Sequence, residues 1–276
     1  MKLQKIKGVA ILPTLLTLGN LLCGFFSIVY VSQDQYKIAA ILIFGAMGFD
    51  ALDGRVARLT KTASNFGIQM DSLADLVSFG LAPAFMVYSL IATSHIEANK
   101  LEIFYKFIVV IAAFYLVCVA LRLARFNIEA GLTKESHEYF IGLPSPGAGG
   151  FLASTVLLYD HLVFNLKVIS AETILLVLPF VVLLLGVLMV SRFRYTHIGN
   201  SFARVHPFIK LLEVLVVALF IAIYHQLTLF IVFLFFILSG PVIYTMQRIS
   251  KKPVPVDNKL LGQAAASDES SDNQIF

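Results

Sequence analysis

Residues 50–75 read DALDGRVARLTKTASNFGIQMDSLAD, and this stretch decides how the flanking apolar runs must be arranged. It holds four aspartates in two pairs, Asp50 with Asp53 and Asp71 with Asp75. Spacings of three and four residues place both members of a pair on one face of a helix. Because the stretch joins two apolar runs, we expect the pairs to meet where one helix ends and the next begins.

The chain as a whole is too apolar for a soluble domain. Of its 276 residues, 58% are hydrophobic and 14% are charged, whereas soluble domains are about a quarter charged. A membrane-spanning helix needs about 20 mostly apolar residues. Eight segments qualify and predict an all-α, polytopic transmembrane helical bundle. They are residues 11–31, 36–58, 71–93, 104–126, 146–163, 171–191, 207–224 and 227–246.

These segments define one transmembrane domain over residues 1–252. Residues 253–276 begin with Pro-Val-Pro and continue with Ala, Ser, Asp and Asn, which predicts a disordered cytoplasmic tail. The first apolar run is long and lacks a small-residue cleavage motif, so we expect an uncleaved helix and not a signal peptide. Cys23 and Cys118 lie inside apolar runs, which favours buried small side chains over a disulfide or a metal site.

The positive charges indicate the orientation of the bundle. With a cytoplasmic N-terminus, 17 of the 21 Lys and Arg residues fall on the cytoplasmic side and four on the other. This predicts a multi-pass protein of the cell (cytoplasmic) membrane with both termini in the cytoplasm. The net charge of +4 then follows from topology, and no nucleic acid partner is needed to explain it.

Carboxylates inside membrane segments are energetically expensive and therefore point to function. Consecutive antiparallel helices place both aspartate pairs at the cytoplasmic membrane depth, where four unpaired charges repel by several kcal/mol. Either some are protonated or cations hold them together, and carboxylate oxygens suit Mg²⁺, Mn²⁺ or Ca²⁺. Two divalent ions would neutralise the cluster and form a clamp for displacement at phosphorus. Pairing with Arg55 and Arg58 is the alternative, but two arginines cannot balance four carboxylates.

The residues between the aspartates suit the same chemistry. Gly54 and Ala57 leave room for a bulky ligand to approach the helix backbone, and Gly67 clears space one turn before Asp71. Arg58 can present a guanidinium group to a phosphate.

This stretch resembles the signature of the CDP-alcohol phosphatidyltransferase family at every fixed position and spacing. The matched pattern is Asp50-x2-Asp53-Gly54-x2-Ala57-Arg58-x8-Gly67-x3-Asp71-x3-Asp75. The resemblance implies a six-helix catalytic core plus two further spans, an active site that faces the cytoplasm, and a homodimer. It also implies that a hydroxyl attacks the phosphorus next to the diacylglycerol of CDP-diacylglycerol and that CMP leaves.

The same resemblance implies roles for individual residues. Two Mg²⁺ or Mn²⁺ ions are expected on Asp50, Asp53, Asp71 and Asp75, with Asp75 also taking the proton from the acceptor hydroxyl. On the first helix, Thr17 and Asn20 are three residues apart and can hydrogen-bond to a substrate. The residues expected to contact CDP-diacylglycerol are Gly54, Ala57, Arg58, Ser64, Gly67, Thr17 and Asn20.

Two further segments bear on the acceptor alcohol. Residues 122–127 (RLARFN) and 142–146 (GLPSP) resemble those of the membrane-bound phosphatidylserine synthases. An arginine pair can grip the carboxylate of L-serine bidentately, so serine is the expected acceptor and Arg122, Arg125 and Asn127 its expected ligands. Residues 15–24 are also similar, although this chain has Thr14 where many relatives have Asn.

Other interpretations stay open at this point. The arginines at the end of the fourth span also fit a positively charged cytoplasmic flank, and a phosphorylated acceptor would want arginines too. A phosphatidylglycerophosphate or phosphatidylinositol-phosphate synthase of the same family is therefore the main alternative. A cation transporter would spread its polar groups through the bilayer depth, and a structural membrane protein has no use for four buried aspartates.

Overall fold

The computed structural model describes residues 11–60, 64–93, 101–132, 139–165, 171–196 and 207–249. The predicted tail at 253–276 lies outside these residues. The α-helices are α1 (Ile11–Val31), α2 (Tyr36–Leu59), α3 (Asn65–Asp75), α4 (Ala82–Thr93), α5 (Leu101–Leu132), α6 (Ser145–Asp160), α7 (Ala171–Val190) and α9 (Pro207–Ile249). Two π-helices, η1 (Leu76–Leu81) and η3 (His161–Asn165), continue α3 and α6. The expected all-helical fold is confirmed, with one short two-stranded sheet in addition.

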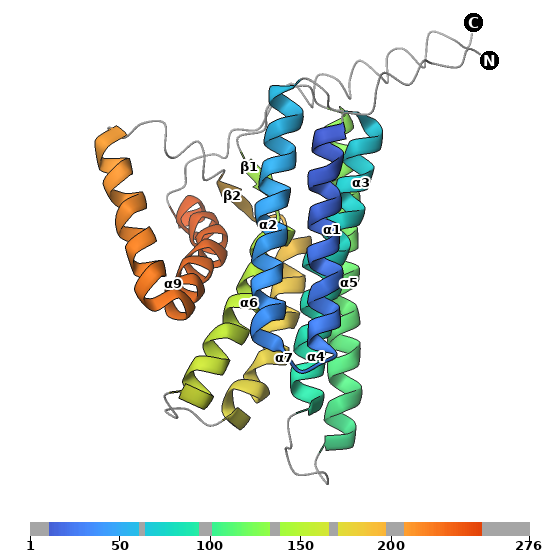
Figure 1. The fold of residues 1–276 in the computed structure, drawn as a ribbon, viewed down its shortest axis with the longest axis vertical. Helices are drawn as coiled ribbons and strands as arrows, with labels where there is room; N and C mark the ends of the chain where they lie inside the picture. The colour runs from blue at the N-terminus through green and yellow to red at the C-terminus, as the bar shows by residue number, and fades with distance from the viewer. Residues whose placement is uncertain are drawn as a thin grey trace, which may run out of the picture. The chain divides into compact units, whose positions relative to one another are not determined.

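Every predicted span overlaps a helix of the structure. Within the residues that the structure describes, five helices are long and apolar enough to cross a membrane: Ile11–Val31, Asn65–Thr93, Phe107–Ile128, Thr173–Val190 and Gln226–Met246. The second span, α2, carries Asp50, Asp53 and Arg55 in its second half and is correspondingly less apolar. The two C-terminal spans share the label α9, but the non-helical backbone of Tyr224 (φ −127°, ψ 52°) divides it into two helices, next to the expected turn at 225–226 (Figure 1).

The third span begins six residues earlier than hydropathy predicts. Ser64 caps α3, because its Oγ accepts a hydrogen bond from the Gly67 N–H at 3.1 Å. The first turn, with Asn65 and Gln69, is too polar to count as part of an apolar run. This extension lengthens the rod that carries Asp71 and Asp75 toward the end of α2.

Small residues bring α1 and α2 together side by side (Figure 1). The buried side of α2 consists of Ala39, Ala40, Ile43, Ala46 and Asp53. Other helices expose apolar side chains on their outer surfaces: Phe180 of α7 is 68% exposed and Val110 of α5 is 65% exposed. Large exposed apolar surfaces mark a membrane contact, in agreement with a multi-pass membrane protein.

The strands β1 (Tyr139–Ile141) and β2 (Arg194–Thr196) pair antiparallel, with Phe140 opposite Tyr195. Gly142 follows β1 with a positive φ of 82°, and its N–H donates to the Phe193 carbonyl at 2.8 Å. A side chain at this position would collide with the Met189 carbonyl and the Arg125 guanidinium, so only glycine fits. The Gly-Leu-Pro-Ser-Pro segment is thereby held against the end of α7.

Candidate active site

Three carboxylates converge where α2 ends and α3 begins. One oxygen each of Asp50, Asp53 and Asp71 lies within 4.8 Å of the other two. Asp53 is 5% exposed, and Oδ1 of Asp71 is buried with no hydrogen-bond partner among the described residues. Two unit charges at this separation repel by about 3–4 kcal/mol at an effective dielectric constant of 20. A hard divalent cation would relieve that repulsion and satisfy the orphan oxygen, so the residues fit a metal site.

Asp75 lies one helical turn beyond Asp71 and does not belong to this group of three. Its side chain is buried, with 7% exposed, and its Oδ1 accepts a hydrogen bond from Asn20 Nδ2 at 3.0 Å. The sequence predicted that four carboxylates converge. The structure brings three together and holds the fourth next to them through α1.

Helix α1 supports both aspartate pairs. Thr17 Oγ1 donates to Asp53 Oδ2 at 2.8 Å, and it also lies 3.1 Å from the Pro13 carbonyl. Asn20, one turn later, donates to Asp75. The sequence assigned Thr17 and Asn20 to the lipid donor, whereas the structure shows both bonded to the carboxylates. Thr17 also faces the neighbouring pocket.

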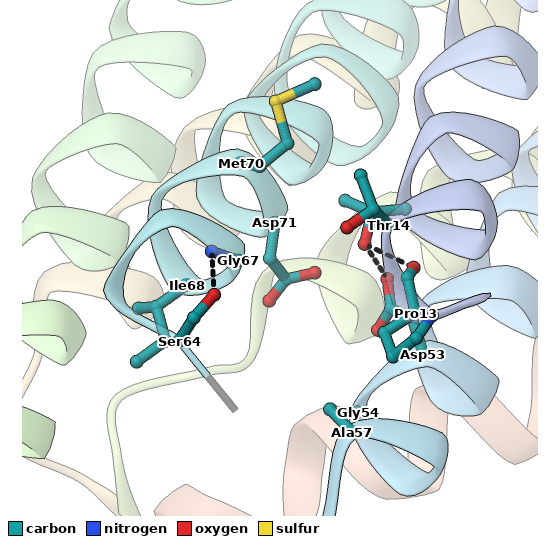
Figure 2. Close-up of a pocket in the computed structure, with 11 residues that line it drawn as sticks. Pro13, Thr14, Asp53, Gly54, Ala57, Ser64, Gly67, Ile68, Met70 and Asp71 are labelled. Carbon is teal, nitrogen blue, oxygen red and sulfur yellow. Dashed lines mark hydrogen bonds between the residues drawn. The ribbon is translucent and has the colours of Figure 1, made fainter. Parts of the chain in front are cut away.

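A pocket lies between α1 and the facing ends of α2 and α3, with about 590 Å³ of empty space when the open solvent at its mouth is included (Figure 2). The carboxylates of Asp53 and Asp71 both point into this space. Its lining comprises Pro13, Thr14, Thr17, Asp53, Gly54, Ala57, Ser64, Gly67, Ile68, Met70 and Asp71. Signature residues from two helices therefore share one wall with two of the three clustered carboxylates.

Five of the seven residues expected to contact the donor line this pocket: Thr17, Gly54, Ala57, Ser64 and Gly67. A Cβ added to Gly54 meets no atom within 4 Å, so this face of α2 is open, as the sequence predicted. The other two lie elsewhere.

Asn20 is buried against Asp75, and Arg58 is exposed on the last turn of α2, outside the pocket lining. Sequence analysis missed Pro13, Thr14, Ile68 and Met70. Pro13 is one helical turn before Thr17, and a search along that face of α1 would have found it.

The residues expected to bind serine have different surroundings. Arg122 is 8% exposed and donates from Nη1 to Ser145 Oγ at 2.7 Å, while its buried Nε has no partner among the described residues. Arg125 turns to α7, donating to the carbonyls of Val190 at 3.2 Å and Met189 at 3.3 Å. Its guanidinium thus caps the C-terminal end of a helix, where positive charge is stabilising.

Asn127 bonds to Ser72 of α3, its Nδ2 donating to Ser72 Oγ at 2.9 Å. Arg122 is near enough to Asp50 and Asp75 to interact with them electrostatically. Of the three predicted serine ligands, Arg122 is therefore the one that the structure places beside the carboxylates.

Comparison with known proteins gives consistent matches along most of the chain. A family model described as CDP-alcohol phosphatidyltransferase matches residues 10–239. The chain is 42% identical over 184 residues to a Helicobacter pylori protein named CDP-diacylglycerol–serine O-phosphatidyltransferase, covering 66% of this chain and 70% of the relative. A Bacillus subtilis protein of the same name is 30% identical over 187 residues, covering 67% and 90%. An archaetidylserine synthase from Methanothermobacter thermautotrophicus is 33% identical over 199 residues, covering 71% and 74%.

Proposed function

Because the chain belongs to the CDP-alcohol phosphatidyltransferase family, we propose that it transfers the phosphatidyl group of CDP-diacylglycerol to the hydroxyl of L-serine. The products are phosphatidylserine and CMP. The observation that carries this proposal is the three-carboxylate cluster at the wall of a pocket lined by the family signature. Serine as the acceptor is supported by the three relatives described above, whose names all specify it.

The donor would lie with its nucleotide along the open face of α2. Gly54 and Ala57 present little side-chain bulk there, so the pyrophosphate can approach the clustered carboxylates closely. Arg58, exposed on the last turn of the same helix, is within reach of a phosphate that extends from the pocket mouth.

Asp50, Asp53 and Asp71 would hold divalent metal, and we assign two ions, Mg²⁺ or Mn²⁺, with Asp75 completing the ligand set. Bound metal would neutralise the charge that develops on the pyrophosphate oxygens as CMP leaves. The buried Asp71 oxygen that lacks a partner supports this assignment, since an unsatisfied buried acceptor is costly.

Asp75 would act as the general base. Its Oδ1 is engaged by Asn20, which fixes the orientation of the carboxylate. The serine hydroxyl oxygen would form a bond to the phosphorus next to the diacylglycerol, the bond from that phosphorus to the CMP oxygen would break, and the hydroxyl proton would pass to Asp75. Positioning and electrostatics supply most of the catalysis in such transfers.

Arg122 would bind the serine carboxylate. Its guanidinium is buried and held from one side by Ser145, and its unpaired Nε leaves a donor for a ligand. Arg125 and Asn127 are the other expected serine ligands. They would position α5, and with it Arg122, through their bonds to α7 and α3. A buried donor without a partner is unfavourable, and the carboxylate of the acceptor would accept a hydrogen bond from this Nε.

We also propose that the protein lies in the cytoplasmic membrane with both termini and the active site on the cytoplasmic side, and that it forms a homodimer. The distribution of Lys and Arg supports the orientation, and the family resemblance supports the dimer. Reporter fusions at each end and light scattering of the purified protein in detergent test these two points.

The experiment that tests the reaction is CMP release by the purified protein from CDP-diacylglycerol in the presence of Mn²⁺ or Mg²⁺. L-serine should support release, and glycerol 3-phosphate and inositol phosphate should not. Release with either phosphorylated acceptor but not with serine would refute the acceptor assignment. Undiminished serine-dependent release after dialysis against EDTA would refute the metal-dependent mechanism.

A further inference from the structure

The helix that carries Asp71 and Asp75 continues from α3 through η1 into α4, and its backbone changes from α-helical to π-helical directly after Asp75. Leu76–Leu81 form a π-helix inside a rod that is otherwise α-helical from Asn65 to Thr93. Such a turn contains one extra residue, and one residue corresponds to about 100° of rotation around an α-helix. The local hydrogen-bond ladder is interrupted, so its backbone groups depend on partners from elsewhere.

Two hydrogen bonds hold this π-helix to neighbouring helices, one to a backbone carbonyl of the π-helix and one from its own Ser78 side chain. The Tyr115 hydroxyl of α5 donates to the Phe79 carbonyl at 2.9 Å, and Ser78 Oγ donates to the Asn20 carbonyl of α1 at 2.8 Å. All four residues have no exposed surface. In such a dry environment, loss of a partner leaves a buried carbonyl or hydroxyl unsatisfied, which is strongly unfavourable.

These contacts connect to the carboxylate through one residue. Asn20 accepts the Ser78 hydroxyl on its backbone carbonyl, and its side chain donates to Asp75. Asp75 and the π-helix that follows it are therefore fixed to the same point of α1. A rotation of the π-helix would strain both bonds together.

Packing allows little alternative winding. A Cβ added to Gly149 of α6 would lie 3.2 Å from Phe79 Cα, and one added to Gly24 of α1 would lie 2.8 Å from Ser78 Cα. Backbones of α1 and α6 thus approach the π-helix from two sides, and Tyr115 completes the enclosure from α5.

We propose that Tyr115 is a positioning residue for Asp75, because its hydroxyl holds the π-helix in the winding that keeps the carboxylate at the acceptor. This inference rests on the proposed function, in which Asp75 is the base. Tyr115 does not touch substrate in this scheme, and it acts through the Phe79 carbonyl. A purely structural tyrosine would affect folding and not the chemical step alone.

The test replaces the hydroxyl without changing the ring, in the full-length protein. Tyr115→Phe should lower kcat for CMP release at least about tenfold, as expected for loss of a buried hydrogen bond of at least about 1.4 kcal/mol. The KM for CDP-diacylglycerol should stay within twofold of wild type, because the donor pocket does not include α5. Ser78→Ala, which cuts the second tether, should give the same division between kcat and KM.

Tyr36→Phe is the matched control. The Tyr36 hydroxyl bonds to Ser89 at 3.1 Å and Thr93 at 2.8 Å, at the opposite end of α2, roughly 20 Å from Asp50. The control variant should retain the wild-type kcat, and its Tm in detergent shows how far the loss of a tyrosine hydroxyl bond affects stability alone.

An unchanged kcat in both Tyr115→Phe and Ser78→Ala would overturn the inference. The inference would also be overturned if Tyr36→Phe lost kcat together with Tm in the same proportion as Tyr115→Phe and Ser78→Ala do. If the wild-type protein fails with serine, the proposed function fails separately. The same variants are then assayed with whichever acceptor supports CMP release. A roughly tenfold loss of kcat in Tyr115→Phe is again the expected result.

Discussion

Replacing Thr17 by Val tests whether α1 holds in place the carboxylates that we propose to bind metal. Thr17 and Asp53 are both 5% exposed, and the bond between Thr17 Oγ1 and Asp53 Oδ2 measures 2.8 Å. Valine keeps the branched shape and removes the hydroxyl. A hydrogen bond to a charged group contributes about 1.5–3 kcal/mol, which corresponds to roughly 10- to 100-fold in a binding constant. Loss of a residue that orients a metal ligand lowers metal affinity by a similar factor, about 10- to 100-fold.

The assay is serine-dependent CMP release as a function of free Mn²⁺ concentration. The Mn²⁺ concentration that gives half-maximal rate should rise roughly 10- to 100-fold in Thr17→Val, by the hydrogen-bond energy above, while the rate at saturating Mn²⁺ falls less.

Thr155→Val is the control. Thr155 Oγ1 bonds to the carbonyl four residues earlier, Phe151, at 2.8 Å, as Thr17 does with Pro13 at 3.1 Å. It has no part in the cluster, so its Mn²⁺ dependence should match wild type. Equal Mn²⁺ curves for the two variants would refute the reasoning, because Thr17 bonds to a carboxylate of the cluster and Thr155 does not.

Four further predictions concern the base, two arginines of α5 and the donor. Asp75→Asn should abolish turnover while CDP-diacylglycerol still binds, and retained turnover would remove Asp75 as the base. Arg122→Lys should raise the KM for serine by a much larger factor than the KM for CDP-diacylglycerol. Arg125→Ala should instead lower Tm because its bonds go to α7 carbonyls, and a selective rise in serine KM would contradict that assignment. Gly54→Ala should fold at least as well as wild type, since alanine favours helix by up to about 1 kcal/mol, yet raise the donor KM. An unchanged donor KM would place the nucleotide elsewhere.

Hydropathy and spacing were sufficient to predict the helices in outline and three of the four carboxylates of the expected cluster. The bounds 11–31 of the first span are those of α1, because its apolar run ends sharply at Ser32. The D-x2-D-G-x2-A-R pattern placed Asp50, Asp53 and Gly54 correctly on one helical face. These features are local, since helical periodicity alone decides which residues share a side.

The remaining features depend on contacts distant in sequence. Arg122 and Arg125 share a helix face by spacing, but their guanidinium groups separate because Gly142 brings the end of α7 next to Arg125 only. The π-helix at Leu76–Leu81 has no sequence pattern of its own, and its partner Tyr115 is 36 residues from Phe79. Neither arrangement can be predicted before the helices are packed.

The first helix explains how a like-charged cluster can exist before any metal binds. Thr17 reaches the aspartate pair of α2, and Asn20 reaches that of α3. A three-residue spacing corresponds to a rise of about 4.5 Å along a rigid helix, so α1 fixes the separation of the two pairs. The carboxylates of α2 and α3 repel one another, so they do not supply this attachment themselves. A hydrogen-bond donor from α1 on each side stabilises the charge of Asp53 and of Asp75 and so offsets part of that repulsion. Metal and donor would then meet a site that is already assembled, which lowers the free energy of organising it during the reaction.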